Sequence, residues 1–347
     1  MSAKNKIHNK TKILVTGGAG FIGSHTVVEL INARYTPIII DNFSNSQPWI
    51  IDRIKEITDQ APAFYEGDCN NKEFLAEVFK KESDIEGVIH FAAYKAVGES
   101  MIKPLDYYRN NLLSLIALLE TMQIFKVKNL VFSSSATVYG DPDFCPIPES
   151  APRKTSPSPY GKTKAMAEDI ISDTVQGNKN ISAIALRYFN PIGAHPSGLI
   201  GELPIGTPNN LVPYVTQTAA KIREELTVFG NDYPTADGFG VRDFIHVVDL
   251  AQAHIATLEH LTKKEAPFYD VFNIGTGKGS SVFEIIETFE KVNHTKVPYK
   301  IGPRRDGDIA TCYADASKIK KEMNWEAQKT LEDSLRDAWR WQKNLTN

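Results

Sequence analysis

The sequence predicts an α/β fold, in which a doubly wound parallel sheet is followed by a smaller C-terminal domain. Short apolar runs such as "KILVTGG", "TPIIIDN", "EGVIHFAA" and "KNLVFSSSATVYG" alternate with longer amphipathic stretches such as "SHTVVELINAR" and "LLSLIALLETMQIF". The short runs lack a strict polar–apolar alternation, which is typical of strands buried on both faces of a parallel sheet. Repeated strand–helix units of this kind favour right-handed crossovers with helices on both faces.

A change in pattern marks the expected domain boundary. Beyond about residue 193, segments such as "GAHPSGLIGELPIGTPNNLVP" are rich in Gly, Pro and Asn, which favour turns. The strand-then-helix pattern returns in "VRDFIHVVDLAQAHIATLEHL". We therefore expect the sheet domain to span residues 12–190 and 240–262, and the smaller domain to span residues 191–239 and 263–345.

Composition narrows the function classes. The 347 residues carry a net charge of −3, with basic and acidic residues interspersed, so neither a nucleic-acid partner nor an anionic membrane is expected. Cysteines are few and far apart, and the histidines lack the spacing of a metal motif, so we expect reduced thiols and no metal. No apolar run has membrane-spanning length, and "MSAKNKIHNKTK" is not followed by the apolar region of a signal peptide. A cytoplasmic protein is the resulting expectation.

A glycine-rich turn follows the first predicted strand. "TGGAGFIG" places Gly17, Gly20 and Gly23 at the opening of a helix. Glycines there allow a pyrophosphate to approach the free N–H groups of the helix N-terminus. The second strand ends about 20 residues further on in Asp41, whose carboxylate can accept bonds from an adenosine ribose and repel a 2′-phosphate. The pattern predicts a dinucleotide site that prefers NAD over NADP, the alternative being a purely structural turn.

The stretch "TSPSPYGKTKAMAED" contains a candidate base. Tyr160 and Lys164 lie one helical turn apart and share a helix face. This spacing alone carries little information, but here it follows a strand that ends in three serines. Pro157 and Pro159 disfavour helical conformation in the residues before them, so the helix is expected to begin at Tyr160, facing the strand ends.

Magnitudes decide whether this lysine can activate the phenol. A phenol has a pKa near ~10, so a tyrosine base needs its anion stabilised by about 4 kcal/mol. A lysine ~4 Å away supplies about 1 kcal/mol in water but about 4 kcal/mol at an effective dielectric constant near ~20. Lys164 therefore suffices in a partly closed cleft. Ser135, at the end of the preceding strand, is the hydroxyl placed to bond the reacting substrate oxygen.

These motifs are similar to those of a known family. "TGGAGFIG", "FAAYK", "SSSATVYG" and "YGKTK" resemble the extended short-chain dehydrogenase/reductase family, whose members have a Rossmann-type sheet domain. Within it, the segments "HFAAYKAVGES", "LRYFNPIGAHPSG", "PNNLVPYV", "VFGNDYPTADGFGVRDFIHVVDLA" and "RRDGDIATCYADASK" resemble those of the UDP-glucose 4-epimerase family. The similarity runs from about residue 12 to about residue 342. It implies an NAD-dependent isomerase of carbohydrate metabolism, acting on UDP-sugars in galactose metabolism, and a homodimer.

The resemblance also implies roles for individual residues. Tyr160 would be the base, Lys164 its electrostatic partner and Ser135 the hydrogen-bonding hydroxyl. Planar guanidinium groups suit a pyrophosphate and a carboxylate suits a ribose hydroxyl, whereas most arginines are merely solvated surface residues. The implied NAD-binding residues are Gly17, Gly20, Phe21, Ile22, Gly23, Asp41, Asn42, Asn45, Ser46, Asp68, Cys69, Phe91, Ala92, Lys95, Asn110, Tyr160 and Lys164. The implied UDP-sugar-binding residues are Ser135, Asn190, Asn210, Leu211, Phe229, Arg242, Arg305, Asp308 and Cys312.

The implied reaction is a redox cycle at C4 of the sugar. Tyr160 would take the proton of the 4-hydroxyl while hydride passes to NAD, and the 4-keto sugar would turn over before hydride returns to its other face. The family often has a tyrosine in the sugar pocket where this sequence has Cys312. The smaller side chain leaves room for an N-acetyl group, so we expect UDP-GlcNAc and UDP-GalNAc to be accepted as well.

Two other functions are weighed against this one. A nucleotide-sugar 4,6-dehydratase must also remove water from the sugar, and "SSSATVYG" offers Ala136 and Thr137 where such an enzyme needs acidic groups. A decarboxylase acting on a UDP-uronic acid is disfavoured in the same way. A non-catalytic, NAD-sensing regulator need not retain Tyr160, Lys164 and Ser135. The epimerase hypothesis accounts for all three residues.

Overall fold

The large domain is built on one seven-stranded parallel sheet. The computed structural model describes residues 11–305 and 307–346. Most of the basic stretch "MSAKNKIHNKTK", residues 1–10, therefore lies outside the described residues. The sheet has the order β11-β6-β5-β4-β1-β2-β3, and every neighbouring pair is parallel. Its strands are β1 (Lys12–Thr16), β2 (Thr36–Asp41), β3 (Ala63–Glu66), β4 (Ile85–His90), β5 (Asn129–Ser135), β6 (Ser182–Tyr188) and β11 (Phe268–Ile274).

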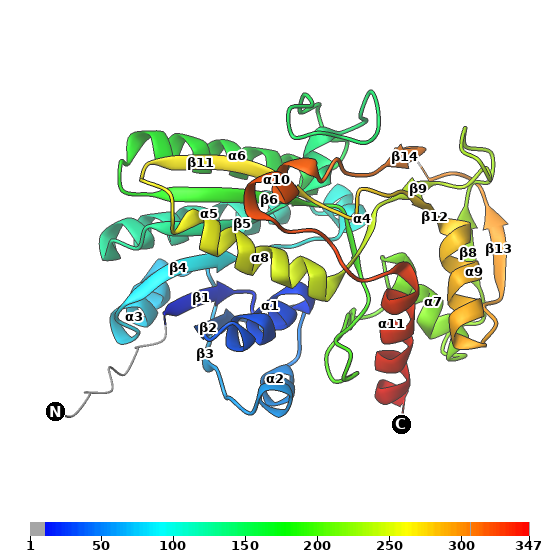
Figure 1. The fold of residues 1–347 in the computed structure, drawn as a ribbon, viewed down its shortest axis with the longest axis horizontal. Helices are drawn as coiled ribbons and strands as arrows, with labels where there is room; N and C mark the ends of the chain where they lie inside the picture. Colours follow the sequence, from blue (N-terminus) through cyan, green and yellow to red (C-terminus); the bar gives the residue numbers. More distant parts are fainter. Residues whose placement is uncertain (1–10, 306, 347) are drawn as a thin grey trace.

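Helices cover both faces of this sheet (Figure 1). Successive residues of β1 supply both apolar cores, because neighbouring strand side chains point to opposite faces: Ile13 and Val15 pack in one core and Leu14 in the other. The predicted doubly wound α/β class is confirmed. The first face carries α1 (Phe21–Asn32), α2 (Ile50–Thr58), α8 (Val247–Leu261) and α10 (Ser317–Met323), and the second carries α3 (Lys72–Lys81), α5 (Pro104–Phe125) and α6 (Pro159–Gly177).

The strand order reverses between β1 and β4. From β1 the chain adds β2 and β3 on one side, and then returns to add β4, β5 and β6 on the other. Ligands of open α/β sheets bind in the crevice outside the carboxyl ends of the strands at such a switch point. The short helices α4 (Val97–Ile102) and η1 (Ala136–Tyr139) follow β4 and β5 at this edge.

One strand lies outside the predicted extent of the sheet domain. Residues 263–345 were assigned to the smaller domain, but β11 within this range pairs with β6 over its full length and forms the edge of the large sheet. The physical reason is the crossover through α8, which returns the chain beside β6 and leaves β11 to cover that strand. The sheet domain therefore includes residues 268–274.

The remaining segments form a smaller, irregular part with its own apolar core, seen at the right of Figure 1. Its pairings are short: β7 with β10, β8 with β13, and β9 with both β12 and β14. The bounds are β7 (Asn190–Ile192), β8 (Leu226–Phe229), β9 (Val241–Arg242), β10 (Phe244–His246), β12 (Ser280–Ser281), β13 (Tyr299–Gly302), β14 (Thr311–Cys312), α7 (Leu211–Ala219), α9 (Val282–Asn293) and α11 (Leu331–Thr346).

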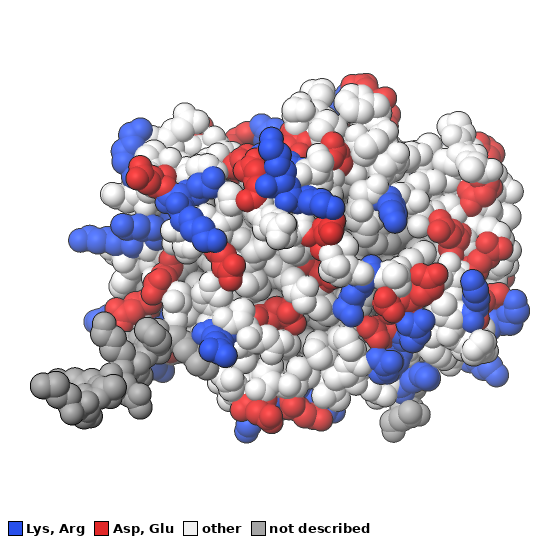
Figure 2. Space-filling model, in the orientation of Figure 1, with Lys and Arg blue, Asp and Glu red and all other residues white. Residues whose placement is uncertain are grey.

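Surface charge is mixed. Figure 2 shows basic and acidic side chains interspersed over the visible face, with no large area of a single sign. Among the described residues, every helix is too short or too polar to cross a membrane.

A buried carboxylate ties the small strands to the large sheet. Asp243, between β9 and β10, is wholly buried. Its Oδ1 accepts hydrogen bonds from the backbone N–H and the hydroxyl of Thr276, at 2.8 and 2.7 Å. Its Oδ2 accepts from the N–H groups of Gly277 (3.1 Å) and Ala314 (3.2 Å). Because four donors converge on it, this side chain fixes the loop after β11 and the segment after β14 around Arg242.

Asp243→Asn should destabilise the protein although the two side chains have the same shape. The amide nitrogen cannot accept, so at least one buried N–H loses its partner, and we expect a loss of about 3 kcal/mol in the free energy of unfolding. Chemical denaturation measures it. Asp173→Asn, on the exposed side of α6, is the control and should change stability by less than about 0.5 kcal/mol. Equal stability of the two variants would contradict this account.

Candidate active site

The predicted cofactor residues gather at one edge of the large sheet. The glycine turn follows β1, Asp41 ends β2, Asp68 and Cys69 follow β3, and Ser135 ends β5. The segment 91–95 follows β4. Because the strands are parallel, their carboxyl ends meet at this edge, and residues from five separate parts of the sequence converge there.

The glycine turn has the geometry of an anion site. Gly17 has a φ of +71°, and a Cβ on Gly23 would lie 2.1 Å from the carbonyl oxygen of Gly17. Gly20 caps α1 without a side chain, so the first N–H groups of the helix are left without a side-chain partner. A Cβ on Gly17 would lie 2.9 Å from the backbone nitrogen of Ala92. The turn is therefore packed directly against the segment after β4.

Asp41 holds the turn in place while it keeps capacity for a ligand. Its Oδ2 accepts from the N–H of Ala19 at 3.0 Å, and its Oδ1 accepts from the N–H of Phe43 and the hydroxyl of Ser46, both at 2.9 Å. A carboxylate can accept about four hydrogen bonds, so Oδ2 can accept one more. Asn42 and Asn45 lie exposed beside it.

The other predicted cofactor residues form a polar rim. Asp68 accepts from Asn70 at 2.8 Å, and the same amide reaches Asn110 on α5 at 3.1 Å. Cys69 is buried, and burial raises the pKa of its thiol to about 12. Glu202, which was not among the predicted residues, accepts from Lys95 at 2.8 Å and from Asn210 at 2.6 Å. It connects a predicted cofactor residue with a predicted substrate residue that is far away in sequence.

The tyrosine stretch forms a tightly packed helix start. Helix α6 begins at Pro159, one residue before the expected position, because proline is well suited to the first helical position. Ser158 is extended, as expected of a residue before proline, and its hydroxyl accepts from the N–H of Gly161 at 3.2 Å. A Cβ on Gly161 would lie 2.1 Å from the Ser156 hydroxyl and 3.1 Å from the Cβ of Thr137. This glycine lets α6 lie against η1, beside Ser135.

Lys164 and Ser135 both lie near Tyr160. The Lys164 ammonium is 4% exposed, lies 5.9 Å from the centre of the Tyr160 ring and donates to the carbonyl oxygen of Ser133 at 2.6 Å. Burial lowers the pKa of Lys164 from 10.5 to about 7. Burial also raises the pKa of Tyr160, and a hydrogen bond with Ser135 counteracts that rise. The three predicted catalytic residues are thus brought together.

The predicted substrate residues form a second cluster. Arg242 and Cys312 are register partners in β9 and β14. Arg242 pairs with Asp308, and the Arg305 guanidinium lies 4.2 Å from the centre of the Phe229 ring. Asn190 begins β7, Asn210 caps α7 and Leu211 is the first residue of that helix.

Tyr233 belongs to this second cluster, although it was given no role when its segment was matched to the family. Its ring lies under the Arg304 guanidinium, and its hydroxyl donates to Asp308 at 3.5 Å. A tyrosine in a turn-rich segment gives no periodic signal, so only its contacts reveal it.

Several contacts link the two clusters. A Cβ on Gly307 would lie 4.0 Å from the Cβ of Pro157, which places the loop of Asp308 near the approach to Tyr160. Ala136 and Cys312 pack against the same small apolar core. The two clusters therefore border one site. Among the described residues, no group of His, Cys, Asp or Glu side chains is arranged to hold a metal ion.

Comparisons with known proteins decide the family. Residues 14–338 match a family model described as GDP-mannose 4,6 dehydratase. The chain is 53% identical over 335 residues to UDP-glucose 4-epimerase of Bacillus subtilis, covering 96% of this chain and 98% of that one. It is 53% identical over 338 residues to the human UDP-glucose 4-epimerase, covering 96% of each. The chain belongs to the UDP-glucose 4-epimerase family.

Solved structures agree with this family. An epimerase structure from Stenotrophomonas maltophila, with bound NAD and formylated UDP-arabinopyranose, has a TM-score of 0.94 at 47% identity and covers 97% of this chain and 99% of that one. A Bifidobacterium longum epimerase in complex with NAD+ and UDP has a TM-score of 0.93, with the same identity and coverage. The dehydratase name belongs to the broader family model. The residues after Ser135 are Ala136 and Thr137, whose hydroxyl donates to Ser135 at 2.9 Å, and neither supplies a carboxylate.

Gly161→Ala should remove activity by displacing the start of α6. Alanine favours a helix over glycine by about 1 kcal/mol, but its methyl group would overlap Ser156 and press on Thr137. We expect the rate of the catalysed reaction to fall at least about tenfold through misplacement of Tyr160. Gly177→Ala, at the other end of α6 with open space around it, is the matched control and should keep full activity. Equal activity of both variants would refute this packing argument.

Proposed function

We propose that this chain is an NAD-dependent isomerase that interconverts UDP-glucose and UDP-galactose by epimerisation at C4. The observation that carries the proposal is the convergence of Tyr160, Lys164 and Ser135 beside a dinucleotide-type glycine turn. The identity of about one residue in two with epimerases over nearly the whole chain supports it. We assign the dinucleotide to the sheet domain and the UDP-sugar to the smaller part of the chain.

The residues at the strand ends fit NAD. The tight packing of Gly17, Gly23 and Ala92 fixes the start of α1. The first N–H groups of this helix, which begins with Phe21 and Ile22, have no side-chain cap and suit a pyrophosphate. Asp41 offers a ribose its remaining acceptor position and disfavours a 2′-phosphate. When bound, NAD supplies the chemistry of accepting a hydride from the sugar and giving it back.

The chain's own residues handle the proton. Tyr160 takes the proton of the sugar 4-hydroxyl as hydride leaves C4, and returns it when hydride returns to the opposite face. The Lys164 ammonium stabilises the phenolate, because a buried cation interacts with it far more strongly than a solvated one does. Ser135 bonds the same sugar oxygen and holds it within reach of the phenol.

The second cluster holds the nucleotide while the sugar turns. Arg242 and Arg305 provide planar guanidinium groups for the pyrophosphate, and Asp308 accepts from a ribose hydroxyl. The Phe229 ring, 36% exposed, offers a face for the base, and Asn190, Asn210 and Leu211 complete the binding surface. An anchored pyrophosphate lets the keto sugar present either face without leaving the site.

Cys312 widens the range of substrates in this proposal. It borders the sugar-binding region through its pairing with Arg242, and its side chain is much smaller than a tyrosine. The extra volume suits a 2-N-acetyl group, so UDP-GlcNAc and UDP-GalNAc are substrates as well.

An exposed apolar face and the free cysteines support our proposals for the assembly and the compartment. Helix α5 exposes Leu105, Leu113, Ile116 and Ile124, and α6, which packs beside it, exposes Met166. A second copy of the chain covers this apolar face in the homodimer that we propose. The three free cysteines suit a reducing, cytoplasmic environment.

Tyr160→Phe should abolish the conversion of UDP-galactose to UDP-glucose. Purified protein is mixed with UDP-galactose without added NAD, and UDP-glucose is measured. Loss of the phenol removes the proton acceptor, and the rate should fall at least about 100-fold. Tyr299→Phe, at an exposed tyrosine on β13, should retain full activity. A parent protein that carries bound dinucleotide but converts nothing would favour the regulator instead.

Cys312→Tyr should separate the two substrate classes. The larger ring fills the space for the N-acetyl group, so conversion of UDP-GlcNAc should fall at least about tenfold. Conversion of UDP-glucose should change by less than about twofold. The two rates are measured on the same preparation. Loss of both activities, or of neither, would count against this account of specificity.

A further inference from the structure

A buried ion pair lies behind the catalytic residues, and the proposed reaction does not use it. Glu168 on α6 is 2% exposed and Arg187 on β6 is 4% exposed. The guanidinium donates through Nε to Oε1 at 2.9 Å and through Nη2 to Oε2 at 2.7 Å. Removing two charges from water can cost more than their attraction returns. The stability of the fold alone therefore does not explain why this pair is buried here.

Three consecutive serines of β5 connect this pair to the site. Ser133 accepts from the Lys164 ammonium at 2.6 Å, and Ser134 donates to Oε1 of Glu168 at 2.5 Å. Ser135 is the hydroxyl beside Tyr160. On the facing helix, Lys164 and Glu168 are one turn apart and share a face. Glu168 is therefore on the same helix as Tyr160 and Lys164, and its carboxylate is hydrogen-bonded to the same run of serines that contacts them.

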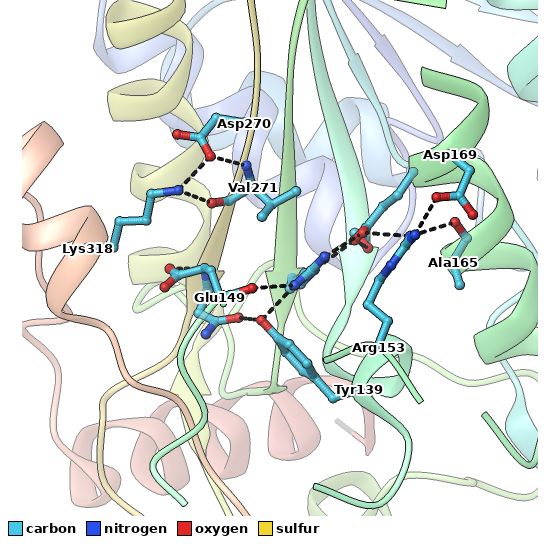
Figure 3. A network of polar contacts seen from close by, with 12 residues as sticks. Tyr139, Glu149, Arg153, Ala165, Asp169, Asp270, Val271 and Lys318 are labelled. Atoms are coloured by element: carbon cyan, nitrogen blue, oxygen red, sulfur yellow. Dashed lines mark hydrogen bonds and ion pairs between the residues drawn. The ribbon is translucent and has the colours of Figure 1, made fainter. Parts of the chain in front are cut away.

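Further contacts hold the ion pair rigid. The Nη1 of Arg187 donates to the Tyr139 hydroxyl at 2.9 Å, and that hydroxyl donates to Asn273 on β11 at 2.7 Å. Figure 3 shows Tyr139 and Arg153 in this network, where Arg153 donates to Oε2 of Glu168 at 3.5 Å and also pairs with Asp169. With its donors thus occupied, Arg187 can hold the carboxylate in one position.

The charged and titratable groups around Lys164 are few. On α6 they are Tyr160 and Glu168, and on β4 the group is His90, which burial and the nearby ammonium keep neutral by lowering its pKa to about 3. On β6, Arg187 faces the far side of Glu168, and Tyr188 interacts with Tyr160. A second cation, Arg153 in the segment before α6, lies 3.5 Å from Oε2 of Glu168. Burial lowers the pKa of Lys164, and Glu168 is the group that opposes this.

We propose that Glu168 is a positioning residue, held by Arg187 and Ser134, that keeps the Lys164 ammonium charged and directed at Tyr160. This inference rests on the proposed function, because it concerns the same proton transfer. The oxygens of Glu168 are bonded to Ser134, Arg187 and Arg153, so it acts on the proton transfer through Lys164. In this proposal the buried pair holds a negative charge near Lys164, and that charge keeps the lysine protonated although burial favours its neutral form.

Glu168→Gln tests the proposal in the purified holoenzyme. Lys164 must carry its proton, and without the carboxylate it loses that proton at a lower pH, so the limb of the kcat profile that Lys164 sets moves down by about one pH unit or more. A weaker cation raises the pKa of Tyr160, so the limb that Tyr160 sets moves up, and the fraction of enzyme that holds both the phenolate and the ammonium falls at every pH. KM should change by less than about twofold. Asp173→Asn, which removes an exposed carboxylate from the same helix, should keep the parent profile.

A second variant covers the case in which Glu168→Gln leaves Arg187 unpaired and unfolds the protein. The double variant Glu168→Gln with Arg187→Gln removes both buried charges and should fold. If the pair serves stability alone, this variant regains the parent pH profile, and the proposal is overturned. If Glu168 acts on Lys164, the variant folds and keeps the shifted limbs of the Glu168→Gln profile.

A titration without turnover separates this inference from the proposed function. The tyrosinate absorbance of each protein, minus that of its Tyr160→Phe counterpart, reports the pKa of Tyr160. That pKa should be higher in the Glu168 variants than in the parent. A parent without epimerase activity would end the proposed function, yet the titration would still decide on Glu168. An active parent whose titration and pH profile match those of the variants would end this inference alone.

Discussion

A lysine ammonium held almost out of water is the interaction on which the rest of the site depends. In solvent, a cation one helical turn from a phenol would stabilise its anion by about 1 kcal/mol, far too little to make tyrosine a base near neutral pH. At 4% exposure, the same contact is strong enough to matter, but burial also drives the lysine toward neutrality. The site must therefore keep Lys164 buried and charged at once. The arrangement of β5 and α6 meets both requirements.

The parallel sheet makes this answer geometrically possible. Its strand ends bring the glycine turn, Asp41 and Ser135 to one edge, and α6 lies along the carboxyl end of β5. The run of serines on β5 then places a carbonyl for Lys164 and hydroxyls for Glu168 and Tyr160 at successive positions. Gly161 permits the approach, because any side chain there would push the helix away. The direction of the strands, the packing of α6 and the buried charges thus all determine where Tyr160, Lys164 and Glu168 lie.

Local patterns in the sequence were enough to predict much of this. The fold class, the glycine turn and the pairing of Tyr160 with Lys164 each depend on residues close together in the chain, where periodicity and turn chemistry act. The misplaced strand β11 shows the limit. Its seven residues carry the signal of a strand, but only pairing with β6 across the crossover reveals to which sheet it belongs. Glu202 was missed for the same reason, because its partner Lys95 is 107 positions away. Such contacts depend on topology, which no short window contains.

The two parts of the site differ in how firmly they are held, and this difference bears on how specificity can vary. Around Lys164, each polar group is tied to the large sheet or its helices, so a change there propagates to the chemistry. Around the second cluster, the strands are two to four residues long and partly exposed, and such segments open locally at low cost. Cys312 lies in one of these short strands, β14, and is paired with Arg242 of the neighbouring strand β9. In the proposed site, a substitution at this position would alter the volume beside the sugar and leave the backbone pairing and the buried ammonium intact. The sugar accepted could then change without disturbing the proposed proton transfer.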